Sequence, residues 1–228
     1  MKKINQTLAL LLLLMPCVTV AQNAIAVQYN LSIQINTTNP TVEKITSRGS
    51  EGAEQVLFTL YAHPTEALFT VDKSVVKRNH NTDIALLIAG YFNPIYSNQE
   101  TKIMQYNNTN LHQIESDKYR IQIPIFTEWK LETETKKIQN LVCYKATGVV
   151  AHDQVLQNVI AWYCPEIPFP HGPLGYGGLP GLILELQRKD VLLGTESINF
   201  NPNLQHIESP EKGIPISEAD FINLIKIN

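Results

Sequence analysis

Several stretches of the chain alternate apolar and polar residues with a period of two, which is typical of strands with one buried and one solvated face. The clearest are residues 29–36, 119–125 and 129–135. Further strands are expected at 56–61, 141–150, 155–163 and 182–187. Pro124 indicates an edge strand or a strand end, because proline cannot donate to a sheet ladder. One-faced alternation with short connections favours an antiparallel sheet.

Helical signals are fewer than strand signals. Asn81, Thr82 and Asp83 can cap a short helix, and Ser217 with Asp220 can open a final one. We therefore predict a mainly β (α+β) fold, in which a curved antiparallel sheet or half-barrel carries a few short helices.

The first residues have the order of a cleaved signal peptide: Lys2 and Lys3, an apolar run at 8–15, and small residues ending at Ala21. We expect residues 1–21 to be removed and residues 22–228 to form a single domain. The protein is then exported and is periplasmic, associated with the outer membrane, or secreted.

No permanent membrane anchor is expected after cleavage. The apolar run is about half of the roughly 20 residues that cross a bilayer, and no later segment is long enough. Cys17 leaves two alternatives open, a lipid attachment site or a cysteine lost with the signal peptide.

Charge argues against nucleic acid as a partner. The formal charge of −3 becomes −5 when Lys2 and Lys3 leave with the signal peptide, and basic residues occur only singly or in doublets. Binding to a phosphate backbone needs a clustered basic surface, which this pattern does not provide.

Two cysteines, Cys143 and Cys164, remain after cleavage. A hairpin centred between Asp153 and Gln154 would place them opposite each other, at a separation that a disulfide can span. Export leads to compartments where disulfides persist. The pair therefore predicts a disulfide, with two buried thiols as the alternative.

The most informative stretch is residues 165–181, here called the Pro/Gly segment. Its seventeen residues include five prolines and five glycines. Proline fixes φ and removes donors, whereas glycine permits positive φ and close backbone approach. This composition excludes a regular helix or central strand and predicts a shaped, ordered loop.

The chain here resembles the GLPGLI proteins of the Bacteroidota, named for the segment that reads Gly178-Leu-Pro-Gly-Leu-Ile183. The likeness extends over residues 132–136, 143–146, 162–163, 165–168, 172–173 and 184–186. It departs around Asn140-Leu141 and in a longer hairpin before Trp162. The resemblance implies an exported envelope protein of unknown activity, found beside outer-membrane transport systems, with an outline similar to half-barrel lipoprotein carriers.

Candidate chemistry is sparse. The histidines at 63, 80, 112, 152, 171 and 206 form no zinc-binding spacing, so neither a metal nor a cofactor is expected. There is no Gly-x-Ser-x-Gly elbow, and the glycine run lacks the Lys-Ser/Thr ending of a phosphate loop. His171 is the only histidine in the Pro/Gly segment, either a ligand or catalytic group or an ordinary loop histidine.

The candidate binding residues lie in and before the Pro/Gly segment. Aromatic side chains supply contact area with a polar handle, and the loop residues shape a cleft or its rim. The candidates are Trp162, Tyr163, His171, Gly172, Pro173, Tyr176, Gly178, Leu179, Pro180 and Gly181.

These residues favour a binding or interaction module, whose partner would be an outer-membrane transport protein or a small apolar ligand. Two alternatives stay open, an enzyme that uses His171 with Glu166 or Glu185, and a purely structural envelope protein.

Overall fold

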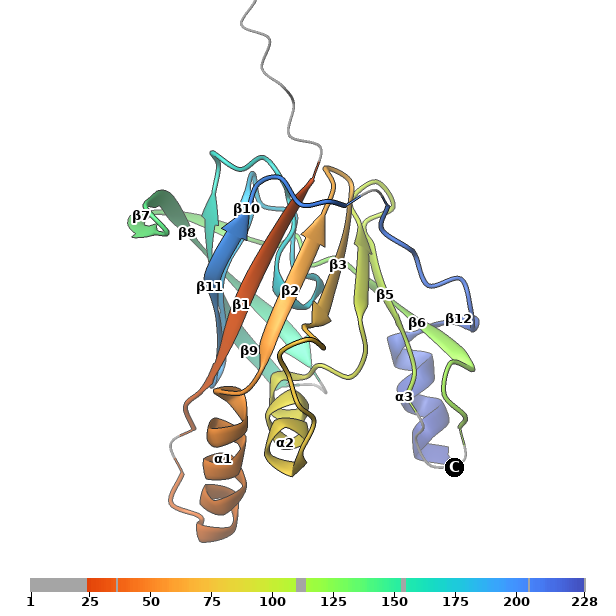
Figure 1. The fold of residues 1–228 in the computed structure, drawn as a ribbon. Coiled ribbons are helices and arrows are strands. Elements are labelled where there is room, and N and C mark those ends of the chain that lie inside the picture. Colours follow the sequence, from red (N-terminus) through yellow and green to blue (C-terminus); the bar gives the residue numbers. More distant parts are fainter. Residues whose placement is uncertain (1–23, 36, 110–113, 153–154, 205, 228) are drawn as a thin grey trace, which may run out of the picture.

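The computed structural model describes residues 24–35, 37–109, 114–152, 155–204 and 206–227 (Figure 1). The expected signal peptide and Cys17 lie outside this part of the chain. The described strands form one twelve-stranded sheet in the order β12-β6-β5-β4-β3-β2-β1-β11-β10-β9-β8-β7. Their bounds are β1 (Ile25–Ile33), β2 (Leu57–Ala62), β3 (Glu66–Val71), β4 (Ile95–Asn98), β5 (Ile103–Asn107), β6 (Tyr119–Pro124), β7 (Lys130–Ile138), β8 (Leu141–His152), β9 (Val155–Cys164), β10 (Leu182–Arg188), β11 (Val191–Asn199) and β12 (Ile214–Ser217).

The mainly β prediction is confirmed, but the sheet is mixed and not purely antiparallel. Neighbouring strands pair antiparallel except β12, which pairs parallel to β6. β6 ends at Pro124, in agreement with a strand end there. The sheet is not closed, since β7 and β12 are its two ends.

The hairpin of β8 and β9 has the expected register. His152 pairs with Val155 and Tyr144 with Tyr163, so the turn is centred between positions 153 and 154. The two positions of the turn themselves lie outside the described residues.

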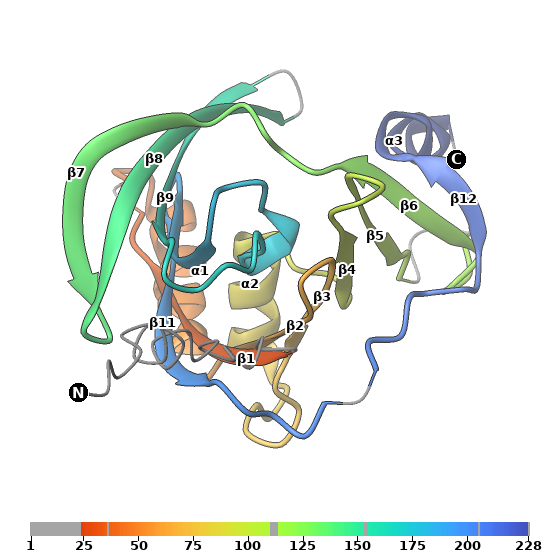
Figure 2. The same ribbon diagram turned by 90° about the horizontal axis from the view of Figure 1, so that it is seen from above.

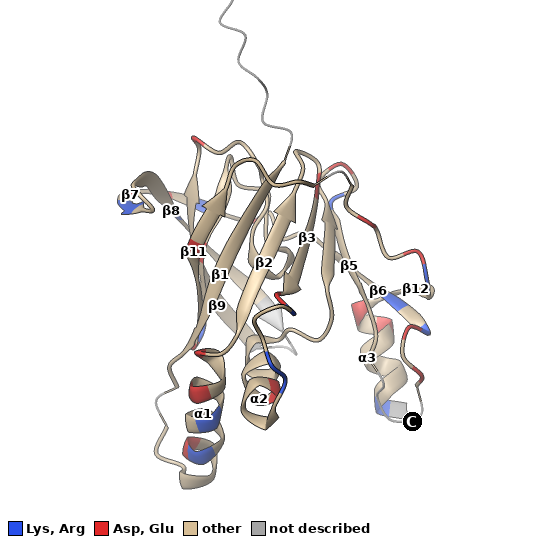
Figure 3. Cartoon of the chain, viewed as in Figure 1, with Lys and Arg blue, Asp and Glu red and all other residues tan. Residues whose placement is uncertain are grey.

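Three α-helices accompany the described strands: α1 (Pro40–Ala53), α2 (His80–Ala89) and α3 (Glu218–Ile227). α3 begins as predicted, since the Ser217 hydroxyl accepts from the amide of Asp220 at 3.1 Å. α1 carries charged residues along its exposed sides (Figure 3) and was not expected, because its buried residues are the small Thr46, Gly49, Gly52 and Ala53, which give no large apolar stripe. An Asn39 cap followed by Pro40 is the sequence signal that marks its start.

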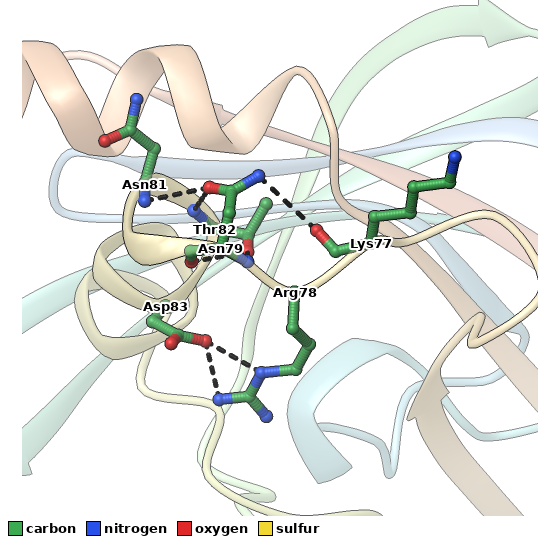
Figure 4. Close-up of polar contacts among 6 residues, drawn as sticks. All are labelled: Lys77, Arg78, Asn79, Asn81, Thr82 and Asp83. Carbon is green, nitrogen blue, oxygen red and sulfur yellow. Dashed lines mark hydrogen bonds and ion pairs between the residues drawn. The ribbon is translucent and has the colours of Figure 1, made fainter.

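The predicted cap of α2 was two residues too late. Asn79 is extended, and its Oδ1 accepts from the amides of Asn81 at 2.9 Å and Thr82 at 3.0 Å (Figure 4). The Thr82 hydroxyl accepts in turn from the Asn79 amide, which completes a capping box. Arg78 and Asp83 add an exposed ion pair at 2.6 Å.

The main core lies on one face of the central strands. Alternate residues of β1 are buried from Ile25 to Ile33, as its period-two pattern requires. Phe58 of β2 stacks on Phe69 of β3 with ring centroids 4.8 Å apart. The Tyr29 hydroxyl donates to the carbonyl of Ile183 at 2.7 Å, which ties β1 to the exit of the Pro/Gly segment.

Candidate functional site

The Pro/Gly segment lies on the inner side of the sheet, between β7–β9 and β3–β5 (Figure 2). It was expected to shape the rim of a cleft, and most of it is instead buried. Gly178 and Pro180 are exposed, but the other loop candidates are buried: His171, Gly172, Pro173, Tyr176, Leu179 and Gly181. The segment therefore fills the interior that the strands surround.

Hydrogen bonds from two distant side chains, one just after β4 and one just before β7, hold the segment in this position. The Gln99 side chain donates to the Pro170 carbonyl at 2.7 Å, and the Trp129 indole donates to the Gly177 carbonyl at 2.9 Å. Within the segment, the amide of Gly178 donates to the same Pro170 carbonyl at 3.1 Å. These bonds satisfy backbone groups that have no sheet partner.

Close packing explains the glycines of the segment. A Cβ at Gly177 would lie 2.5 Å from the carbonyl oxygen of Pro170, and one at Gly175 would collide with the sulfur of Met104. A Cβ at Gly172 would lie 2.7 Å from the Cβ of Ile183. The predicted close backbone approach is thus present at these positions.

Tyr176 belongs to an aromatic cluster and is not an exposed loop residue. Its ring centroid lies 6.2 Å from that of Phe126 and 6.1 Å from that of Trp129. Burial raises the pKa of the Tyr176 hydroxyl, while the nearby Arg188 guanidinium opposes the rise. Phe126 and Trp129 were missed as site residues because they precede Tyr176 by about fifty positions.

Trp162 and Tyr163 point to opposite faces of β9, as neighbours on a strand must. Trp162 packs beneath Lys136, whose Nζ lies 4.4 Å from the ring centroid and 2.6 Å from the Glu185 carboxylate. Tyr163 instead packs beside Tyr144, with centroids 6.1 Å apart. The two aromatics therefore cannot line one cleft together.

His171 is fully buried and is not paired with a carboxylate. Its Nδ1 lies 3.4 Å from the Ser97 hydroxyl, and its Nε2 has no hydrogen-bond partner among the described residues. Burial lowers the pKa of His171 to about 4, against smaller opposing effects of the Pro64 and His63 backbone. The ring is therefore neutral near pH 7.

The structure does not bring His171 together with Glu166 or Glu185, the catalytic group that the enzyme alternative requires. Glu185 is engaged with Lys136, and Glu166 is exposed on the surface. Within the described ranges, no hydrogen bond or ion pair joins either carboxylate to His171, and no group of three His, Cys, Asp or Glu residues is placed to hold a metal ion.

A cavity of about 870 Å³ adjoins the Pro/Gly segment. Its walls come from α2 and the residues after it, from β4–β6, from the β8–β9 hairpin, from the β10–β11 turn and from the loop itself. Most of the lining side chains are apolar, including Ile95, Met104, Ile123, Phe126, Leu174 and Val191. Tyr176 is the sequence-predicted candidate whose side chain lines it.

Four lining residues are apolar and exposed. Leu87, Phe92, Val149 and Leu156 are 63%, 51%, 50% and 74% exposed, and they come from two separate parts of the chain, the region around the end of α2 and the β8–β9 hairpin. Apolar side chains that gather at a cavity are typical of a binding site. Sequence reasoning missed all four because no local pattern relates them.

The predicted disulfide is not formed in the structure. Cys143 and Cys164 are both buried free thiols, although the β8–β9 register places them opposite each other. The Cys143 sulfur is directed to the Leu141 carbonyl at 3.7 Å. Burial raises the pKa of Cys143 to about 12 and raises that of Cys164 as well, so both remain protonated near neutral pH.

We expect protein of residues 22–228, which lacks Cys17, to show no thiol reactive toward Ellman's reagent while folded and two after denaturation, when purified with reductant. The reason is that both sulfurs are buried and protonated. Rapid reaction of the folded protein would contradict the burial. The same count on unreduced protein from an oxidising compartment tests the disulfide itself, because a bond would leave no thiol after denaturation.

The segment from 150 to 185 is matched by a family described as a protein of unknown function, Porph_ging. This match covers the β9 strand and the Pro/Gly segment. It supports similarity to a Bacteroidota-associated family of unknown function, under a name other than the expected GLPGLI. No curated protein matches the chain in sequence.

The fold is similar to that of PNGF-II in two crystal forms. In one form the TM-score is 0.56 at 15% identity, and in the other it is 0.54 at 14% identity. Each likeness covers 90% of this chain and 33% of PNGF-II. The chain thus spans about a third of PNGF-II, and at this identity the likeness shows the fold alone.

No helix in the described ranges is long and apolar enough to cross a membrane.

Proposed function

We propose that this protein is an exported envelope module of the GLPGLI type that binds an apolar ligand in the cavity beside the Pro/Gly segment. The observation that carries the proposal is the cavity of about 870 Å³ with exposed apolar residues among its walls. This volume lies within the range of about 300–1,000 Å³ that small-molecule sites occupy. The half-barrel carrier outline expected from the sequence agrees with such a role.

The exposed lining residues support a ligand and not only a packing defect. An exposed leucine loses favourable burial of roughly 2 kcal/mol, so four such side chains around one opening are costly unless something covers them. The Pro/Gly segment closes the inner end, where Leu174 and Tyr176 are buried against the sheet. In this proposal the segment is the rigid floor of the site.

Replacing Leu156 with glutamate is expected to weaken binding of N-phenyl-1-naphthylamine, an uncharged apolar probe, by roughly tenfold or more, because a charge beside the probe loses solvation. The measurement is probe fluorescence at increasing protein concentration. Leu156 is 74% exposed, so the variant is expected to fold normally.

The matched control is Leu131→Glu. Leu131 is 55% exposed on β7 and does not line the cavity. Equal weakening by both substitutions, or no saturable binding by the unmodified protein, would contradict the proposal. In the latter case an outer-membrane transport protein would be the partner to test next by affinity purification.

A further inference from the structure

Arg188 brings a positive charge to the wall of the apolar cavity. It is the last residue of β10, and its side chain reaches the end of α2, where Nη2 donates to the Ala89 carbonyl at 2.9 Å. A Cβ at Gly90 would lie 2.6 Å from the same Nη2, so the guanidinium is seated directly against the helix end. The side chain is half-buried.

No carboxylate neutralises this guanidinium. In the described part of the chain, none is within ion-pairing distance of Arg188. The partial negative charge of the α2 C-terminus holds the cation in place. The Ala89 carbonyl and the Tyr176 hydroxyl engage two of the five N–H donors of arginine, which leaves donors for a ligand.

The acidic residues of the cavity are engaged or placed on other elements. Asp190 lies 3.7 Å from the ammonium of Lys189. Glu218 begins α3, and its charge adds to the burial that raises the pKa of Tyr106 to about 12. Glu128 lies in the connection between β6 and β7. Two cations, Arg188 and Lys189, and three acids therefore line one cavity, but of the acids only Asp190, which is paired with Lys189, is on the β10–β11 turn.

Tyr176 adds a second polar group beside the guanidinium. Its hydroxyl is close enough to Arg188 for the positive charge to oppose the effect of burial on its pKa. The adjoining walls, Ile95, Met104 and Leu174, are apolar. A guanidinium with a phenol at an apolar wall matches a molecule with an acidic head and a hydrocarbon body.

We propose that the cavity binds an amphiphile with an anionic head, either a carboxylate or a phosphate, whose head contacts Arg188 and Tyr176 and whose hydrocarbon chain lies on the apolar walls. This inference rests on the proposed function, because it names the ligand class of the same site. It is separable from that function, since an apolar ligand needs no charge.

The test is displacement of N-phenyl-1-naphthylamine by four ligands that share one alkyl chain, each below its micelle-forming concentration. The ligands are dodecanoate, dodecyl phosphate, dodecanol and dodecylammonium. We expect one or both anions to bind at least about tenfold more tightly than dodecanol, because a charge-assisted hydrogen bond to Arg188 contributes that much affinity. The two anions distinguish a carboxylate from a phosphate head.

Arg188→Gln is expected to remove the preference for the anion while leaving the affinity for dodecanol within about twofold. The dodecanol affinity reports directly whether the cavity is intact. Arg188→Lys keeps the charge and is expected to retain a preference for the anion. A purely structural role of Arg188 would change all affinities together.

Four outcomes would overturn the inference. Equal binding of anion and dodecanol would leave an apolar site without a head-group preference, so the proposed function would stand alone. Tightest binding of dodecylammonium would assign the head to Glu128 or Glu218. Failure of all four ligands to displace a bound probe would exclude the amphiphile and leave the proposed function to the Leu156→Glu test, whereas absence of probe binding would remove both proposals.

Discussion

Replacing Gly181 with alanine is expected to lower the free energy of unfolding by about 3 kcal/mol or more, the largest effect of any single substitution proposed for this protein. Gly181 has φ of 155°, where side chains are strained, and its Cβ would collide with the Cys164 carbonyl oxygen. The same Cβ would lie 2.9 Å from the Cα of Pro165. Both obstacles are backbone, so a rotamer change cannot relieve them.

Urea unfolding followed by circular dichroism measures this effect, and Gly194→Ala is the matched control. Gly194 lies in β11 with no atom within 4 Å of an added Cβ and no positive φ. Alanine there is expected to change stability by less than about 1 kcal/mol. A Gly181→Ala protein as stable as the Gly194→Ala protein would show that the segment can move away from β9.

Acidification from pH 6.5 to 4 is expected to lower stability by about 3 kcal/mol through His171 alone. Its pKa is about 4 in the folded protein and near 6.5 in the unfolded chain. In this window the unfolded chain binds the proton first, so stability falls as the pH falls. Well above pH 6.5, where the histidine of the unfolded chain is also neutral, this contribution no longer changes.

The measurement is urea unfolding at pH 7, 5.5 and 4 for the unmodified protein and for His171→Gln. The quantity of interest is the difference between the two pH profiles, because other groups titrate in both. His206→Gln removes an exposed histidine and serves as the control. Parallel profiles for the unmodified protein and His171→Gln would mean that the ring is not desolvated.

The long alternating strands and the β8–β9 register were predictable because their signals are local. Period-two burial in β1 and the apolar hairpin strands follow directly from pleating. α1 escaped prediction because it packs through glycines: a Cβ at Gly52 would collide with the Asn81 carbonyl. β11 combines an apolar start with a polar end, which weakens its alternation.

The shape of the Pro/Gly segment was predictable, but its burial was not. Proline and glycine specify an irregular path, whereas the groups that draw this path inward, Gln99 and Trp129, lie far away in sequence. The cavity is still less visible from sequence. Its walls come from several elements. Arg188 is held at the cavity wall because α2 ends beside it and offers the Ala89 carbonyl as an acceptor.

The position of β1 at the centre of the sheet has a consequence for folding kinetics. Ala26 pairs with Tyr61 on one side and with Asn199 on the other, so the second pairing closes a loop of most of the chain. Such long-range pairing slows folding. During synthesis, the first strand gains only one neighbour until nearly the whole chain has emerged. β11, which lies late in the chain, therefore completes the core that β1 begins.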